Sequence, residues 1–323
     1  MIQIEGAGNG KADLLPVMIL GPTASGKSEL ALGMAQSLGG EIINADAMQV
    51  YRGLDIGTGK IPAKDRLRIP HHLLDVLEPG AVFSAGEFRR RTLACIDDIR
   101  SRGKRPILVG GTGFYLRALA KSLAPIAPVP GSVRESLNTL MRRRGTRVMH
   151  RMLEVLDPPA ALKIAPSDRQ RIERALEVML ASGRRFSSQQ EGEMTGGDRL
   201  LFLKIGLNLP RPVLWKRIEE RVGRMVAEGW LEEVGSLLAQ GVSPEAHAMK
   251  SIGYREMAQV VEGLATLETA TELIITRTRQ FAKRQMTWFR REEGIFWVDG
   301  LVAEIAGRAS LNYIRDKDKE KIK

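Results

Sequence analysis

The fold is decided by an eight-residue stretch, Gly21-Pro22-Thr23-Ala24-Ser25-Gly26-Lys27-Ser28. It lies between an apolar run over 17–20 and a segment over 28–38 in which apolar residues have helical spacing. A loop of this pattern between a strand and a helix is a P-loop, typical of ATP- and other nucleotide-binding proteins, whose backbone N–H groups surround a phosphate chain. We therefore predict that residues 21–28 bind a diphosphate, with the charge of Lys27 on it and Ser28 as a ligand of Mg²⁺.

Apolar runs alternate with helical patterns after this loop. We expect strands over 41–45, 73–77 and 106–109, and helices over 84–102 and 112–121. Strands that alternate with helices form parallel sheets, and ligands gather where those strands end. The predicted fold class is α/β, a P-loop NTPase-like core with a parallel sheet flanked by helices, plus an inserted helical lobe.

The inserted lobe is predicted from a change in composition at a proline-rich segment, residues 122–131, which resembles a hinge. We expect the first part of the core over 1–122, the lobe over 123–200 and the mostly helical second part over 201–323. Within the lobe, helices are expected over 132–145, 146–156 and 167–183, followed by a polar stretch over 184–199. In the second part, we expect strands over 201–207 and 296–298 and a frayed tail after Asn312.

Charge points to a polyanionic partner, because the chain carries a formal net charge of +11. The segment 277–291 holds six basic residues and no acidic ones, and Arg277, Arg284 and Arg291 recur on one helical stripe. Without carboxylates nearby in the sequence, this stripe is predicted to follow an RNA backbone, and a solvated face is the alternative. The stripe of Phe281, Gln285 and Trp288 is expected to be core.

Several classes of protein are disfavoured by what the sequence lacks. The single cysteine, Cys95, excludes a disulfide framework and any zinc site built on cysteines, and we expect it to pack in a helix. The adjacent His71 and His72 point in different directions, so a metal site there is not expected. The N-terminal stretch has no apolar run of the signal-peptide kind, and no segment reaches the roughly 18 apolar residues of a membrane span. We expect a cytoplasmic protein without membrane contacts.

The type of phosphate chemistry is indicated by the absence of one carboxylate that P-loop NTPases usually have. P-loop NTPases commonly end a neighbouring strand with an Asp that organises the metal, but the strand over 106–109 ends in Gly110 and Gly111. Asp46, at the end of the strand over 41–45, is the carboxylate expected to face the P-loop. The alternative role for Asp46 is a helix cap or a structural turn residue.

The motifs together resemble the tRNA dimethylallyltransferase (tRNA isopentenyltransferase) family, in the order of that family and across about 17–291. The matching stretches are the P-loop, Asp46-Ala-Met-Gln49-Val-Tyr-Arg-Gly-Leu-Asp-Ile-Gly-Thr58, His71-His-Leu-Leu-Asp75, Gly110-Gly-Thr-Gly-Phe-Tyr115, Gln170-Arg-Ile-Glu-Arg174, Ser251-Ile-Gly-Tyr-Arg-Glu256 and residues 277–291. One departure is Ala47, because the family usually has Asp-Ser. It leaves any role of that hydroxyl in doubt, but not the role of the carboxylate.

The resemblance implies transfer of a dimethylallyl group from dimethylallyl diphosphate to the N6 amine of the adenosine 3′ of the anticodon in tRNA. It implies that Asp46 is the general base, that Lys27 and Thr112 assist catalysis, and that the P-loop holds the donor with Mg²⁺. Arg217 and Arg221, four apart on one helical face, are candidates for the diphosphate, with a solvated face as the alternative. The residues implied to contact tRNA are Asp46, Ala47, Met48, Gln49, Thr112, Arg134, Gln170, Arg171, Ile172, Glu173, Arg174, Arg277, Lys283 and Arg284. The expected partners are tRNA and dimethylallyl diphosphate, and we expect a monomer.

Three other functions stay open at this point. A P-loop kinase of a nucleoside or another small molecule shares the loop but requires ATP, and an RNA-binding ATPase module would carry out no transfer; the missing strand-end Asp disfavours both. An adenylate isopentenyltransferase would use a free nucleotide as acceptor. Between residues 123 and 200 the chain has 13 Lys and Arg against 9 Asp and Glu. This surplus and the basic segment 277–291 favour tRNA as the acceptor.

Overall fold

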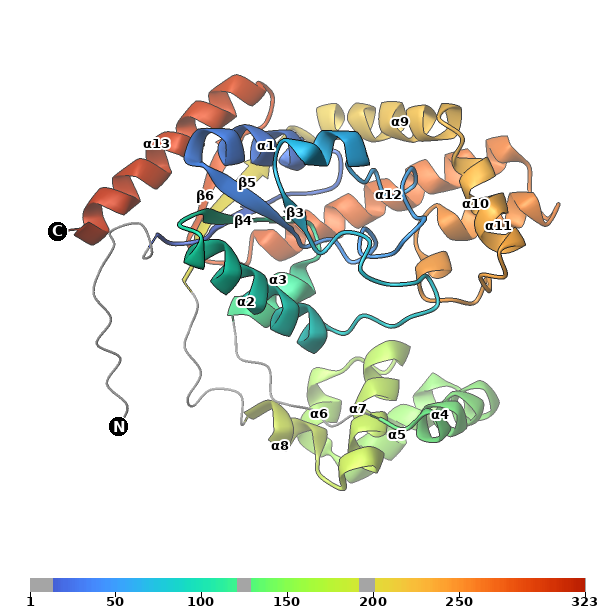
Figure 1. Ribbon diagram of the computed structural model, residues 1–323. Helices are drawn as coiled ribbons and strands as arrows, with labels where there is room; N and C mark the ends of the chain where they lie inside the picture. Colours follow the sequence, from blue (N-terminus) through green and yellow to red (C-terminus); the bar gives the residue numbers. More distant parts are fainter. Residues whose placement is uncertain (1–13, 121–128, 192–200, 323) are drawn as a thin grey trace. The chain divides into compact units, whose positions relative to one another are not determined.

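The computed structural model describes residues 14–120, 129–191 and 201–322 of the 323-residue chain (Figure 1). Internal contacts divide the chain into two compact units. One, the sheet unit, comprises Met1–Arg117 and Leu201–Lys323, and the other, the helical unit, comprises Ala118–Leu200. Most of the predicted hinge over 122–131 lies outside the described residues.

The sheet unit is built on a six-stranded parallel sheet with the order β3-β2-β4-β1-β5-β6. The strands are β1 (Val17–Leu20), β2 (Gly40–Asn44), β3 (His71–His72), β4 (Arg105–Gly110), β5 (Leu203–Asn208) and β6 (Ile295–Asp299). Val17 at the start of β1 is level with Ile107 of β4 and Leu203 of β5. β1 is therefore central, and the P-loop follows it at the carboxyl edge of the sheet. The predicted α/β class with a parallel sheet is confirmed.

Helices cover both faces of this sheet and extend beyond its carboxyl edge. They are α1 (Lys27–Leu38), α2 (Ala85–Ser101), α3 (Gly113–Ala120), α9 (Arg211–Ala227), α10 (Trp230–Ala239), α11 (Tyr254–Val261), α12 (Leu267–Phe289) and α13 (Ala303–Ile322), with short 3-10 helices η1 (Ala63–Leu67) and η3 (Ala248–Lys250). α2 begins where the Ser84 hydroxyl accepts the N–H of Glu87 at 3.1 Å. No helix in the described part of the chain is both long and apolar enough to cross a membrane.

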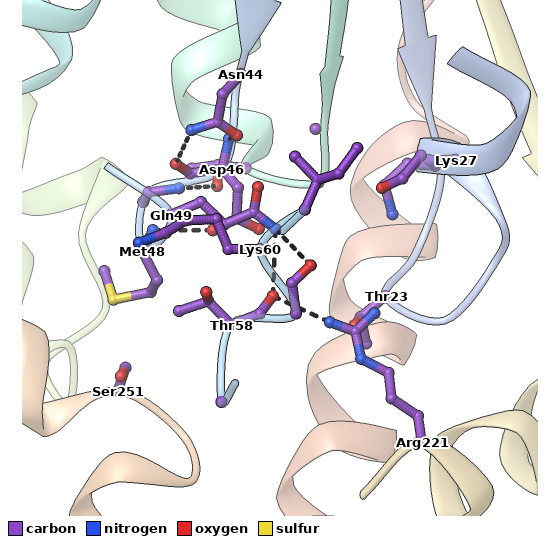
Figure 2. A pocket seen from close by; sticks show the side chains of 18 of the residues that line it. Thr23, Lys27, Asn44, Asp46, Met48, Gln49, Thr58, Lys60, Arg221 and Ser251 are labelled. Atoms are coloured by element: carbon purple, nitrogen blue, oxygen red, sulfur yellow. Dashed lines mark hydrogen bonds between the residues drawn. The ribbon is translucent and has the colours of Figure 1, made fainter. Parts of the chain in front are cut away.

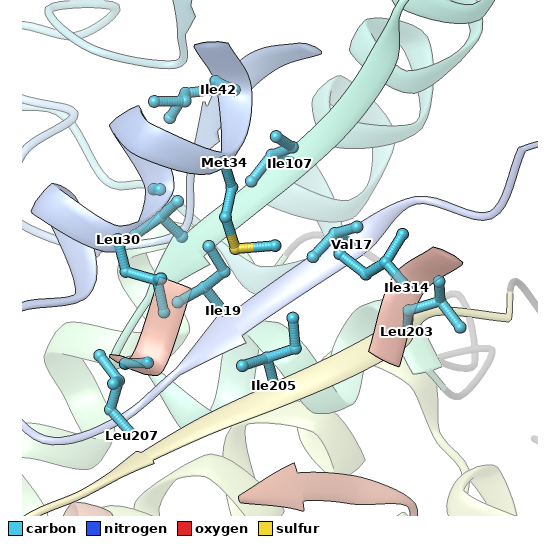
Figure 3. Close-up of a cluster of buried hydrophobic side chains, with 14 of the residues drawn as sticks. Val17, Ile19, Leu30, Met34, Ile42, Ile107, Leu203, Ile205, Leu207 and Ile314 are labelled. Carbon is cyan, nitrogen blue, oxygen red and sulfur yellow. The ribbon is translucent and has the colours of Figure 1, made fainter. Parts of the chain in front are cut away.

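One face of the sheet packs on α1 and α13 through a continuous apolar core (Figure 3). Val17 and Ile19 alternate along β1 so that both point to this face, where Leu30 and Met34 of α1 meet them. Each fully buried side chain of this size contributes about 1.5–3 kcal/mol of hydrophobic free energy. This core fixes α1, and with it the helix N-terminus that follows the P-loop.

The strand expected over 73–77 is wrong. The strand β3 ends at His72, because Leu73 and Asp75 both adopt positive φ, 62° and 55°, which no strand contains. The Asp75 carboxylate instead accepts from the buried ammonium of Lys60 and from Arg66, both at 2.6 Å. The tertiary ion pairs thus replace the expected ladder, and the pairing that remains there is an isolated bridge between Tyr51 and Leu77.

The tail after Asn312 is not frayed, contrary to the prediction. It is the second half of α13, in which Ile314 is fully buried in the sheet core. Asp318, further along, forms an ion pair of 2.7 Å with Arg105, whose side chain is 2% exposed. The helical pattern of apolar residues in the second half of α13 is weak, because charged residues surround the few apolar ones.

The helical unit contains α4 (Gly131–Arg144), α5 (Thr146–Leu156), α6 (Pro158–Lys163), α7 (Arg169–Ser182) and α8 (Phe186–Glu191) around its own apolar core. The last helix, α8, lies in the stretch predicted only as polar. Buried Asp157 explains it. Its carboxylate accepts the N–H of Ala160 in the first turn of α6, and it accepts both the N–H and the hydroxyl of Ser187 in α8. Residues 192–199 of that polar stretch lie outside the described residues.

Candidate active site

A pocket of about 660 Å³ lies at the carboxyl ends of β1, β2 and β4, within the sheet unit (Figure 2). Its lining includes the P-loop, the turn at Asp46, the loop over 57–62, the segment 250–254 and side chains of α9 and α12. Charged groups such as Lys27, Asp46 and Arg221 share it with apolar side chains such as Val222, Met225, Trp230, Ile274 and Phe281. Such a lining suits a ligand with an anionic part and an apolar part.

The P-loop forms as predicted from its glycines. Gly26 has φ 91°, in the left-handed region that glycine adopts without a steric penalty, and it is the N-cap of α1. Thr23, Lys27 and Ser28 line the pocket. The remaining five residues of the loop carry the backbone from the end of β1 into α1, so the helix N-terminus, which favours anions, opens onto the pocket.

Lys27 is held in the loop by its own backbone. Its Nζ donates to the carbonyl oxygen of Pro22 at 2.6 Å. Burial above all, together with the positive charge of Arg221, lowers the pKa of Lys27 from 10.5 to about 7, and the Asp46 carboxylate partly offsets both effects. A negatively charged ligand would raise the pKa of Lys27 again and keep its ammonium charged, so the pocket favours binding of an anion.

Asp46 sits in a tight turn at the end of β2. Its N–H donates to Asn44 Oδ1 at 2.9 Å, and its own Oδ1 accepts from the N–H of Met48 at 2.8 Å. Its Oδ2 accepts no hydrogen bond from any residue that the structure describes. One oxygen therefore fixes the turn, as the structural alternative supposed, while the other is free for a proton.

Buried Asn44 supports this turn, although nothing in the sequence distinguishes it beyond its place near a strand end. Its Nδ2 donates to the carbonyl oxygens of Asp46 and Leu73, each at 3.1 Å. The Thr112 hydroxyl, from the end of β4, accepts the N–H of Ala47 at 3.2 Å. The turn at Asp46 is thus fixed by β2 and β4 together, and Thr112 lines the same pocket.

Gln285 of α12 is a second residue that the sequence did not mark as part of the site. Its side chain is 7% exposed, its Oε1 accepts from the N–H of Thr23 at 2.9 Å, and its Nε2 donates to the carbonyl oxygen of Gly111 at 2.9 Å. It therefore ties the P-loop to the loop after β4. The sequence feature that could have indicated this role is a polar side chain on the helical stripe of Phe281 and Trp288, a stripe that was expected to belong to the core. Phe281 of this stripe also lines the pocket.

The two arginines expected at the diphosphate have different surroundings. Arg221 lines the pocket, and its guanidinium donates to the carbonyl oxygen of Thr58 at 3.0 Å. Arg217 does not line it, because its guanidinium donates to the carbonyl oxygens of Gly300 and Leu301 after β6. The prediction for Arg217 is therefore corrected: it fastens α9 to the β6–α13 connection.

Of the residues expected to contact tRNA, Ala47, Met48 and Gln49 line the pocket together with Asp46 and Thr112. Gln49 Nε2 donates to the carbonyl oxygens of Thr58 at 3.2 Å and Gly59 at 3.4 Å. The loop over 57–59 therefore presents carbonyl groups to both Gln49 and Arg221 (Figure 2).

The other candidates from the middle of the chain belong to the helical unit. Ile172 is fully buried in the core of that unit, so its side chain is corrected from an RNA contact to a packing residue. Glu173 pairs with Arg169 at 3.0 Å. Arg134 and Arg174 both pair with Glu177 at 3.2 Å, and Arg171 pairs with Asp168 at 3.4 Å. These three arginines and Gln170 are the exposed members of the predicted group.

The basic stripe of α12 is not uniform. Arg277 forms an ion pair with Glu256 of α11, whose side chain is 1% exposed, so the expectation of an unpaired Arg277 is wrong. Glu256 lies 21 residues earlier in the sequence and on another helix, so the composition of the segment 277–291 does not reveal this ion pair. Lys283, Arg284 and Arg291 are exposed and form no ion pair with any carboxylate among the described residues.

The histidine pair has structural partners. His72 Nε2 lies 2.8 Å from Glu41 Oε2, and His71 Nδ1 lies 2.7 Å from the carbonyl oxygen of Ile69. The residues that the structure describes include no group of three or more His, Cys, Asp or Glu side chains able to hold a metal ion.

A parallel sheet with a P-loop at its central strand, and a carboxylate from the adjacent loop in the same pocket, defines a P-loop NTPase-like protein. The family model described as IPP transferase matches residues 49–292. The chain belongs to this family, and the resemblance to tRNA dimethylallyltransferases predicted from its motifs is confirmed.

Relatives and solved structures agree with this assignment. The tRNA dimethylallyltransferase of Geobacter sulfurreducens is 47% identical over 283 residues, which cover 88% of this chain and 91% of that protein. The crystal structure of a tRNA delta(2)-isopentenylpyrophosphate transferase from Staphylococcus epidermidis aligns with a TM-score of 0.67 at 35% identity, covering 94% of this chain and all of that one. A structure of a eukaryotic dimethylallyltransferase acting on tRNA aligns with a TM-score of 0.79 at 29% identity, covering 94% and 80% of the two chains.

Proposed function

We propose that this protein transfers a dimethylallyl group from dimethylallyl diphosphate to the N6 amine of an adenosine in tRNA, the one 3′ of the anticodon, and releases diphosphate. The observation that supports this most directly is that Lys27 of the P-loop and Asp46 line one pocket with an apolar wall. The loop offers a site for a diphosphate, the apolar wall suits a prenyl chain, and the free oxygen of Asp46 is a base beside them.

The reaction needs one bond to form and one to break. The N6 nitrogen attacks the allylic carbon, and the bond between that carbon and the diphosphate oxygen breaks with its electron pair leaving on diphosphate. Asp46 Oδ2 accepts the proton that the amine loses, a contribution that is worth about 10² to 10⁴ in rate for a positioned base. Lys27 and Arg221 balance the charge that develops on the leaving oxygen.

The residues present fit Mg²⁺ as a cofactor. The Ser28 hydroxyl lines the pocket and is a hard oxygen ligand. Mg²⁺ commonly takes only one or two protein ligands and completes its shell with water and substrate phosphates, which agrees with a site that has few carboxylates. When bound, the ion would add positive charge to the diphosphate.

The acceptor adenosine must leave its base stack to reach Asp46, at a cost of a few kcal/mol. Ala47, Met48 and Gln49, beside Asp46, are placed to contact this base once it enters the pocket. The exposed cations of α12, Lys283, Arg284 and Arg291, fit the phosphates of the same RNA.

The test is incubation of the protein with labelled dimethylallyl diphosphate, Mg²⁺ and bulk tRNA, followed by digestion to nucleosides. We expect label on the N6 of adenosine, in tRNAs with adenosine 3′ of the anticodon. Equal transfer to free adenosine monophosphate would favour the adenylate isopentenyltransferase function instead. Phosphate transfer from ATP to a nucleoside, with no prenyl transfer, would favour the kinase.

A further inference from the structure

The first turn of α10 fastens together two segments of the pocket lining that are far apart in the sequence. One is the loop over 55–59, of which residues 57–59 line the pocket, and the other is the segment 250–254 before and into α11. We call this first turn, with its side chains Trp230 and Glu233, the α10 clasp. Neither residue is part of the P-loop or of the turn at Asp46, and neither was predicted to contact tRNA.

Glu233 makes the polar half of the clasp. Its Oε2 accepts the N–H groups of Asp55 at 2.9 Å and Ile56 at 2.7 Å, and its Oε1 accepts the N–H of Gly57 at 3.3 Å. Oε1 also accepts the hydroxyl of Tyr254, in the other segment, at 2.5 Å. One carboxylate thus satisfies three successive backbone N–H groups of the loop and a side chain of α11.

Trp230 makes the apolar half. It is 2% exposed and packs against both Gly57 and Gly253, where a Cβ on either glycine would overlap the indole ring. Its ring meets that of Tyr254 edge-on, with centroids 5.8 Å apart. The same two segments are therefore joined a second time, one helical turn before Glu233.

The loop held by the clasp is the one that orients two polar side chains of the pocket. The Thr58 carbonyl accepts from Arg221 at 3.0 Å and from Gln49 at 3.2 Å. If the loop shifts, both side chains lose the acceptor that fixes their direction. Arg221 then points less accurately at the diphosphate, and Gln49 at the acceptor base.

We infer that Glu233 is a positioning residue of the transfer reaction, which sets the direction of Arg221 and Gln49 through the backbone of the loop over 55–59. It touches neither substrate, and the inference rests on the proposed function. Its carboxylate is needed rather than its bulk, because only a group with two acceptor oxygens serves three N–H groups and a hydroxyl at once.

The test is the variant Glu233→Gln, in which the amide nitrogen faces backbone N–H groups and accepts nothing. We expect KM for dimethylallyl diphosphate to rise about tenfold, because bonds to a charged group are lost where the loop meets the pocket. The value of kcat should fall less than threefold, since Asp46 is untouched. Tyr254→Phe, which removes a single bond to the clasp, should raise KM by a smaller factor.

A double-mutant cycle separates positioning from general stability. If Glu233 acts through Arg221, then adding Glu233→Gln to Arg221→Gln should raise KM for the donor little beyond the single Arg221→Gln value. Independent, multiplying effects would overturn the inference, as would an unchanged KM in Glu233→Gln. The matched control is Asp318→Asn, which breaks the buried ion pair to Arg105 between α13 and β4 and should lower Tm without altering KM.

Binding of inorganic diphosphate, followed by calorimetry, keeps this inference distinguishable from the proposed function. It requires neither a prenyl chain nor an acceptor. Should the unaltered protein fail to prenylate tRNA, the proposed function is wrong, yet weaker diphosphate binding in Glu233→Gln than in Asp318→Asn would still support the clasp. Equal diphosphate affinities in those two variants would overturn it.

Discussion

Two walls of one pocket are held in place by different means. The first, made of the P-loop and the turn at Asp46, is shaped largely by short-range contacts: Lys27 bonds to Pro22, and Asp46 bonds to Asn44 and Met48. The second, made of the loop over 57–59 and Arg221, is shaped by partners more than 160 residues apart, such as Arg221 with Thr58 and Glu233 with Gly57.

The difference shows which part of the pocket can be recognised from sequence motifs and which part cannot. The first wall carries the chemistry, and its turns are formed by neighbouring residues, with Thr112 and Gln285 as additional long-range supports. The second wall aims side chains at the substrate, and its geometry depends on the packing of α9, α10 and α11. Changes in the first wall should therefore reduce the rate of transfer most, and changes in the second should act mainly on substrate binding.

The largest expected effect is that of Asp46→Asn. The variant keeps an acceptor oxygen for the N–H of Met48 but loses the base, so kcat should fall by about 10² or more while the affinity for tRNA stays within a few fold. Single-turnover transfer and a filter-binding titration measure the two quantities. Turnover close to that of the unaltered protein would remove Asp46 as the general base.

Next in size is Lys27→Ala, which removes a charge-assisted contact to the leaving group. The affinity for dimethylallyl diphosphate should drop about 10- to 100-fold near pH 6.5, because a hydrogen bond between charged groups contributes roughly 1.5–3 kcal/mol. Transfer should slow as well, since this contact strengthens as the bond breaks.

The pKa of Lys27 determines how the affinity for dimethylallyl diphosphate should change with pH. Its pKa is lowered to about 7 without a ligand, and a bound diphosphate raises it again, so binding takes up a proton above pH 7. The donor affinity of the unaltered protein should therefore fall between pH 7 and 9, and the loss caused by Lys27→Ala should shrink over the same range. A loss that is equal at pH 6.5 and 9 would contradict a titrating Lys27.

A smaller effect separates two arginines of one helix. Arg221→Gln should raise KM for the donor about tenfold, since Arg221 lines the pocket, whereas Arg217→Gln should leave KM within twofold. Arg217→Gln should instead lower Tm, because the bonds to Gly300 and Leu301 are lost. Steady-state kinetics and thermal unfolding of both variants check this, and equal KM values would contradict the different roles of the two arginines.

The smallest effect on activity is expected from the exposed cations of α12. Each of Arg284 and Arg291 should neutralise about one phosphate, so replacing both with Gln should reduce the slope of log affinity for tRNA against log salt by roughly two units. Donor binding should not change. Arg277 is left intact, because its loss would strand the buried carboxylate of Glu256.

The control for this pair is Arg308→Gln on α13, an exposed arginine paired with Glu304 one turn away. It should leave the salt slope unaltered. If the salt slope of tRNA binding is the same in the unaltered protein, the double variant and Arg308→Gln, the α12 cations are an ordinary solvated surface. This is the alternative that the sequence left open.

The sequence by itself determined the parallel sheet, the P-loop and the approach of Asp46 to it. Apolar alternation along β1 and the glycine at position 26 are local properties, and parallel strands bring their carboxyl ends to one edge whatever the details of packing. The role of Asp46 as general base stays a prediction, and its Oδ1 serves the turn by accepting the N–H of Met48.

The tertiary structure alone decided which of several equivalent side chains reach the site. Arg217 and Arg221 share a helical face, yet one binds the β6–α13 connection and the other the pocket loop. Arg277 meets Glu256, Gln285 joins Thr23 to Gly111, and Glu233 clasps the loop over 55–57. In each case the partner lies on a different element, and helical periodicity specifies a face but not the group that the fold places against it.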